Sequence, residues 1–207
     1  MIVSVNQIEA TIAKAAWGRG WPHGLAEECG RAAAWLSTRG FDGVRTALAA
    51  IEPGPAEPLI DETTDAIVFG AAQAIHAAPS AYDLLAADIG LERVVLQEID
   101  QPLLVIGFGG MAALAYQSCY RLTFAEGCRV IVDGSAVSIA GTLPPSGAEA
   151  VIEAEGAGEE GTPAVLTDME IDGSLWHDAL TMAAESYVAS SLSSRKFGAG
   201  AGIIDDD

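Results

Sequence analysis

The stretch that decides the fold is Arg129-Val130-Ile131-Val132-Asp133-Gly134-Ser135-Ala136-Val137-Ser138-Ile139. Two runs rich in β-branched residues flank an Asp-Gly pair, which is a strong short-range signal for a β-hairpin. Residues 120–124 lie just upstream and alternate apolar with polar side chains, which predicts a neighbouring strand with one solvated face. We therefore expect an antiparallel sheet in this part of the chain.

The wider region, residues 65–172, is predicted to be mixed and rich in strands. An apolar run at 103–106 is followed by Gly107-Phe108-Gly109-Gly110, after which residues 111–117 favour a short helix. Residues 66–78 leave helix and buried strand open, because an Ala-rich segment contains Gly70. Further strands are expected at 92–99, 150–155 and 165–171.

The region before it, residues 4–51, is predicted to form three helices. Two overlapping capping boxes open the first helix, Ser4 with Gln7 and Asn6 with Glu9. The glycines and proline of 17–24 interrupt it, and a second helix is expected from about Leu25. Asp42 is expected to cap the third helix. Residues 52–64, with three prolines, are predicted to be a linker.

At the other end, residues 173–207 predict a helix capped by Ser174 and then a tail rich in Gly and Ala. A chain of 207 residues is long enough for one well-buried core. We expect a single α+β domain over 1–207, with N-terminal helices packed on a mainly antiparallel sheet.

Composition excludes some partners and favours one compartment. Ten basic residues face 29 acidic residues, and the formal charge of −19 opposes binding to nucleic acids and to anionic membranes. Such a surface suits either a solvated acidic face or a docking face for a basic partner. Three cysteines without CxxC spacing, together with an N-terminus that lacks the pattern of a secretory signal, predict a reducing cytoplasm.

Two motifs near opposite ends of the chain resemble a known family. They are Trp-Gly-Arg-Gly…Gly-Leu-Ala-Glu-Glu at 17–28 and Ser-Arg-x-x-Gly-Ala-Gly-Ala-Gly-x-x-Asp at 194–205. Together they resemble the uncharacterised bacterial family named domain of unknown function 3726, over the whole chain. That family has no settled activity, so the resemblance implies no particular chemistry.

The Gly-Ala tail predicts a site for a small anion, a carboxylate or a phosphate. Alternating glycines let backbone N–H groups face an anion, and a neighbouring arginine and serine add hydrogen bonds. One alternative is that the tail is a loose terminus. The other is that the tail contacts another subunit, either in a homo-oligomer or as part of a non-catalytic assembly protein. The residues expected to bind are Ser194, Arg195, Gly198, Gly200 and Gly202, with Arg19 from the first motif.

Acid–base chemistry is best supported in the first motif. The best cluster is Glu27 or Glu28 beside Arg19 and His23, in a loop flanked by tryptophans that would desolvate a carboxylate. Glu27 and His23 are the candidate catalytic residues. The alternative is that Trp17, Trp21 and Trp35 anchor the core and the two glutamates stabilise a helix start. No HExxH or CxxC pattern is present, so we expect neither a metal nor a cofactor. Gly107–Gly110 is open to two interpretations, a phosphate cradle and a close backbone turn.

Overall fold

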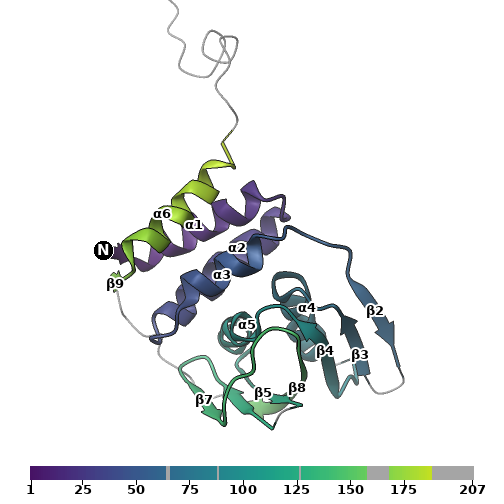
Figure 1. Ribbon diagram of the computed structural model, residues 1–207. Helices are drawn as coiled ribbons and strands as arrows, with labels where there is room; N and C mark the ends of the chain where they lie inside the picture. Colours follow the sequence, from purple (N-terminus) through teal and green to yellow (C-terminus); the bar gives the residue numbers. More distant parts are fainter. Residues whose placement is uncertain (64–65, 88, 126, 158–167, 188–207) are drawn as a thin grey trace, which may run out of the picture.

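The computed structural model describes residues 1–63, 66–87, 89–125, 127–157 and 168–187 (Figure 1). Helices and strands are mixed along the chain, which confirms the predicted α+β class. The helices are α1 (Val5–Gly18), α2 (His23–Ser37), α3 (Gly43–Ile51), α4 (Ala74–Ala86), α5 (Pro102–Tyr116) and α6 (Gly173–Ala184). The strands are β1 (Ile2–Ser4), β2 (Leu59–Glu62), β3 (Ala66–Gly70), β4 (Arg93–Ile99), β5 (Ser118–Phe124), β6 (Arg129–Val132), β7 (Val137–Ala140), β8 (Ala148–Ala157) and β9 (Asp168–Glu170).

Seven strands form one sheet in the order β2-β3-β4-β8-β5-β6-β7. Neighbouring strands are antiparallel except for β3 and β4, which run parallel and are joined through α4. A parallel pair needs a long crossover of this kind, because a tight hairpin reverses the chain direction. The prediction of a mainly antiparallel sheet is confirmed.

The hairpin predicted from Asp133-Gly134 is formed by β6 and β7, in which Val132 pairs with Val137. The Asp133 carboxylate stabilises the turn by accepting hydrogen bonds from the N–H groups of Ser135 (2.8 Å) and Ala136 (2.7 Å). An aspartate in this position takes the place of a backbone acceptor, which is why it favours turns.

The three N-terminal helices occur as predicted, with small changes at their ends. Ser4 caps α1 in a reciprocal capping box with Gln7, which confirms the first of the two overlapping boxes; the second, Asn6 with Glu9, is wrong because Asn6 lies inside the helix. Helix α2 begins at His23, two residues before Leu25. Pro22 occupies the N-cap position, where a residue without an N–H group costs the helix no hydrogen bond. Asp42 caps α3 and accepts a hydrogen bond from the N–H of Arg45 at 3.3 Å.

Two predictions around the linker need correction. The predicted linker 52–64 contains strand β2, whose four residues are all exposed, so its composition carries no strand pattern. The ambiguous segment 66–78 contains both elements, the strand β3 followed by the start of α4.

The segment Gly107-Phe108-Gly109-Gly110 is neither a turn nor a phosphate cradle, because it lies inside the continuous helix α5. Each glycine allows a bulky side chain to approach the helix backbone. A Cβ atom would lie 2.9 Å from Leu36 at Gly107, 2.5 Å from the Tyr82 hydroxyl at Gly109, and 2.1 Å from the Trp35 ring at Gly110. These glycines therefore serve close packing of α5 on α2 and α4.

The C-terminal part differs from expectation in two details. The cap of α6 is Asp172 rather than Ser174; its Oδ1 accepts hydrogen bonds from the N–H groups of Ser174 and Leu175, at 2.9 and 3.1 Å. The strand expected at 165–171 is β9, and it pairs with β1 outside the large sheet. The Gly-Ala tail lies outside the described residues.

The helices lie on one side of the seven-stranded sheet in Figure 1, with α4 and α5 between the sheet and the group of α1, α2, α3 and α6. Alternate strand residues such as Leu96, Leu122 and Ile152 are fully buried. In the described part of the chain, every helix is too short or too polar to cross a lipid bilayer. The arrangement brings three helices, α2, α4 and α5, together at one junction.

Candidate functional site

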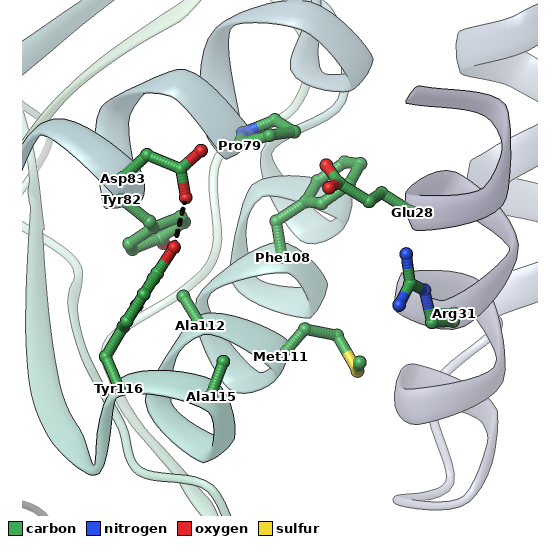
Figure 2. Close-up of a pocket in the computed structure, with 10 residues that line it drawn as sticks. All are labelled: Glu28, Arg31, Pro79, Tyr82, Asp83, Phe108, Met111, Ala112, Ala115 and Tyr116. Atoms are coloured by element: carbon green, nitrogen blue, oxygen red, sulfur yellow. Dashed lines mark hydrogen bonds between the residues drawn. The ribbon is translucent and has the colours of Figure 1, made fainter. Parts of the chain in front are cut away.

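A cavity of about 130 Å³ lies where α2, α4 and α5 meet (Figure 2). Helix α5 lines it with Phe108, Met111, Ala112 and Ala115, which follow the spacing i, i+3, i+4 and i+7 of one helical face. Pro79 of α4 adds to this apolar lining. The volume of this cavity is smaller than the roughly 300–1,000 Å³ of pockets that bind drug-sized ligands, so its ligand must be small.

The wall of the cavity is held in place by buried contacts of Tyr82 in α4. Its hydroxyl donates a hydrogen bond to the carbonyl oxygen of Val105 at 3.1 Å. Its ring meets that of Tyr120 edge to face, with 4.8 Å between centroids. Both rings are buried, and the cavity is therefore formed before any ligand enters.

Four polar side chains surround the opening. Glu28 and Arg31 project from α2 with a spacing of i and i+3, which places them on the same face of that helix. Across the opening, the hydroxyl of Tyr116 donates a hydrogen bond of 2.7 Å to Asp83 Oδ1. Among the ion pairs between described residues, none includes Glu28, Arg31 or Asp83.

The environment changes the proton affinity of two of these groups. Burial raises the pKa of Glu28, and the nearby charges of Asp83 and Glu27 raise it further, whereas Arg31 opposes them. The hydrogen bond to Asp83, followed by burial, raises the pKa of Tyr116 to about 12. The phenol therefore stays protonated and donates to Asp83 at neutral pH.

The N-terminal part of the chain matches the model of a known protein family. Residues 3–74 match the family model described as "Protein of unknown function (DUF3726)". This match confirms the resemblance predicted from the motifs over residues 3–74, and its extension over the rest of the chain stays a prediction. It includes the first motif at 17–28 and ends before the second motif at 194–205. No curated protein matches the chain.

Two solved dehydrogenase structures resemble the fold. Malate dehydrogenase from Entamoeba histolytica superposes with a TM-score of 0.52 at 13% sequence identity, covering 70% of this chain and 50% of the enzyme. Malate dehydrogenase from Pyrococcus horikoshii OT3 gives a TM-score of 0.49 at 11% identity, covering 71% of this chain and 52% of the enzyme. The chain thus spans about half the length of either enzyme. At these identities the likeness concerns the fold alone.

The cavity crosses the boundary of the DUF3726 segment. Glu28 and Arg31 lie within the matched residues, whereas Asp83, Phe108 and Tyr116 follow them in the chain. A ligand in this cavity would contact both parts of the molecule.

The structure brings together only part of the predicted catalytic cluster. His23 Nδ1 lies 3.5 Å from Glu27 Oε1 on the exposed start of α2. Arg19 instead pairs with Glu185 at the C-cap of α6, with 3.0 Å between Nε and Oε2. Their catalytic and binding roles stay predictions.

The two tryptophans of this motif have different surroundings. Trp21 is buried and its indole N–H donates to the carbonyl oxygen of Ile51 at 3.4 Å, which is the role of a core anchor. Trp17 is 53% exposed, and its ring lies edge-on to that of His23 at 5.6 Å between centroids. Together they do not enclose Glu27, which is itself exposed.

Several predicted residues lie outside the described residues, namely Ser194, Arg195, Gly198, Gly200 and Gly202. Their roles stay predictions. Within the described ranges, no three His, Cys, Asp or Glu side chains are grouped so that they could hold a metal ion. Cys29 and Cys128 are buried, and burial raises the pKa of the Cys29 thiol, which opposes formation of a reactive thiolate.

The sequence left Glu27 and Glu28 open as the carboxylate of the first motif, and the structure places Glu28, not Glu27, at the cavity. Arg31, Asp83 and Tyr116 carry no motif, because they meet only through the packing of three helices. The available signal was the spacing of Glu28 and Arg31, together with the apolar face of residues 108–115.

Proposed function

We propose that this protein binds a small metabolite bearing a carboxylate in the cavity between α2, α4 and α5. The observation that carries the proposal is Arg31, which lines an apolar cavity and has no ion-pair partner among the described residues. A guanidinium binds a carboxylate through two parallel hydrogen bonds, which makes it suited to this ligand class.

The formal charge of −19 does not oppose such a site. Charges more than about 8 Å apart across solvent are largely screened at physiological salt. The local balance at the opening, one cation against two carboxylates, matters more than the total. A ligand of low net charge is favoured by that balance.

The fold likeness is compatible with this ligand class. The name of the E. histolytica enzyme denotes malate, a small carboxylate, as its substrate. We extend only the ligand class to this chain and propose binding rather than hydride transfer, because the chain spans half of that enzyme.

Anion binding by the tail remains a separate proposal, as does its alternative, an assembly protein that uses the tail and the acidic surface as contacts. The tail proposal depends on Arg195, and the cavity proposal depends on Arg31. The two can therefore be separated by single substitutions.

A thermal-shift screen tests both proposals with carboxylates, phosphates, nucleotides and divalent metals. The variants are Arg31→Gln and Arg195→Ala, with Arg129→Gln on the exposed side of β6 as the control. A ligand at 100 times its Kd stabilises the protein by about 2.7 kcal/mol, which raises Tm by roughly 5–10 °C for a chain of this size.

We expect carboxylates to raise Tm in the wild type and in Arg129→Gln, and not in Arg31→Gln. Loss of the shift in Arg195→Ala alone would assign binding to the tail instead. No shift with any compound would contradict both binding proposals and favour the assembly alternative.

A further inference from the structure

We infer that the ligand of this cavity is a zwitterion with an apolar side chain, such as a small aliphatic α-amino acid. This inference rests on the proposed function and specifies its substrate class. It assigns the carboxylate of the ligand to Arg31, the ammonium to the space between Glu28 and Asp83, and the hydrocarbon part to the face of α5 that carries Phe108 and Met111.

The ammonium position follows from two carboxylates that border the same opening from different helices. Glu28 comes from α2 and Asp83 from α4, and Figure 2 shows both directed toward the space above Phe108. The charge of Asp83 contributes to the raised pKa of Glu28, so the two groups repel each other when ionised. An ammonium group between them would remove that repulsion and donate a hydrogen bond to the carboxylate on either side.

The spacing of the two charged groups follows from α2. Glu28 and Arg31 stand three residues apart on one helical face, where Cβ atoms are roughly 5–6 Å from each other. An α-amino acid carries its ammonium and carboxylate on neighbouring atoms, and it can reach both side chains at once. The charge of Arg31 lowers the pKa of Glu28, but no ion pair within 4.0 Å joins these two described residues, so the ligand need not break one.

The apolar wall completes the match. Phe108 is 4% exposed and Ala112 is 9% exposed, and with Met111 and Ala115 they give the cavity an apolar wall on α5. A hydrocarbon side chain gains burial there, whereas a second charged group would lose its hydration. The volume of about 130 Å³ limits that side chain to a few carbon atoms.

Four compounds of matched shape test the assignment by titration calorimetry on the full chain. L-leucine carries both charges, 4-methylpentanoate and 2-hydroxy-4-methylpentanoate carry only the carboxylate, and 3-methylbutylamine carries only the ammonium. We expect L-leucine to bind at least tenfold more tightly than each of the other three, because each charge-assisted contact contributes about that factor.

Two variants assign the charges to residues. Glu28→Gln should reduce the affinity for L-leucine about tenfold and leave that for 4-methylpentanoate unchanged, whereas Arg31→Gln should weaken both. The controls are Glu92→Gln, an exposed glutamate ahead of β4, and Arg129→Gln; neither residue lines the cavity. Circular dichroism and Tm check that all variants are folded.

The failures of the two proposals are distinguishable. If 4-methylpentanoate binds as tightly as L-leucine and Glu28→Gln changes nothing, the zwitterion assignment is overturned and carboxylate binding stands. If all four compounds fail to bind, the assignment to an aliphatic amino acid is overturned, and the wider screen of carboxylates decides on the proposed function.

Discussion

Helix α5 has one face that is closely packed against its neighbours and another face that lines a cavity. On one face, Gly107 and Gly110 let Leu36 and Trp35 of α2 come so close that a single added carbon has no room. On the other face, residues 108–115 line a cavity that α2 and α4 leave open. The close face fixes how near the helices lie, and that distance determines the size of the opening on the other face.

The first test of this comparison, and the one with the largest expected effect, is Gly110→Ala. The new Cβ would lie 2.1 Å from the Trp35 ring, which is itself stacked under the Arg39 guanidinium at 3.7 Å. Forcing the ring aside should destabilise the protein by about 2–3 kcal/mol, measured by urea unfolding.

The matched control is Gly24→Ala, because Gly24 also lies in a helix and a Cβ there would meet no atom within 4 Å. Alanine is the better helix former, so this variant should gain about 0.5–1 kcal/mol. If both variants behaved alike, close packing would not explain the glycine at 110.

The second test fills the open face. Ala115 is exposed and lines the cavity, so Ala115→Trp should block it without disturbing the core. We expect the affinity for L-leucine to fall more than tenfold while the free energy of unfolding changes by less than about 0.5 kcal/mol. Calorimetry and urea unfolding measure the two effects. Unchanged affinity in a folded variant would place the ligand elsewhere.

The sequence predicts those parts of the fold that are encoded within a few residues. The Asp133-Gly134 hairpin, the Ser4 capping box and the Asp42 cap all depend on hydrogen bonds between near neighbours. The sequence therefore predicts each of these features at the correct residues. Strand β2 was missed because its exposed residues gain their pairing from β3 and not from a pattern of their own.

The two faces of α5 could not be predicted in the same way. Glycines in a run indicate a turn unless a large partner is known to lie against them, and Trp35 and Tyr82 are 75 and 27 residues distant from Gly110 and Gly109 in the chain. The cavity depends on the same long-range packing. Residue types alone do not separate Glu27 from Glu28, whereas the packing places Glu28 in the opening and leaves Glu27 beside His23.

The third test uses pH to compare the opening with the surface. Burial, with Asp83 and Glu27, raises the pKa of Glu28 above its ordinary value of 4.5. Folding therefore favours the protonated form, and this contribution to stability is lost as pH rises from 4.5 through the raised pKa. Glu28→Gln should match the wild type near pH 4 and exceed it at pH 7, by less than about 1 kcal/mol because water screens a half-exposed charge.

Urea unfolding at pH 4 and pH 7 measures that difference, with Glu92→Gln as the control for the change in net charge. The charge of Arg31 opposes the rise in the pKa of Glu28, so Arg31→Gln should enlarge that rise. If the free energy of unfolding of Glu28→Gln exceeded that of the wild type by the same amount at pH 4 and at pH 7, packing and not charge would explain the difference in stability.

The smallest effect is expected from Tyr116→Phe at the edge of the open face. The variant loses the hydrogen bond of 2.7 Å to Asp83, but Tyr116 is 45% exposed and water replaces the lost partner. The free energy of unfolding should fall by less than about 1 kcal/mol.

In the wild type, ultraviolet titration should assign a pKa of about 12 to the Tyr116 phenol. Asp83→Asn should lower that pKa, because it removes the carboxylate that accepts the phenol's hydrogen bond. A phenol that titrates at its ordinary pKa in both proteins would mean that Asp83 does not face Tyr116 in solution, and the opening would then lack the carboxylate that the ammonium requires.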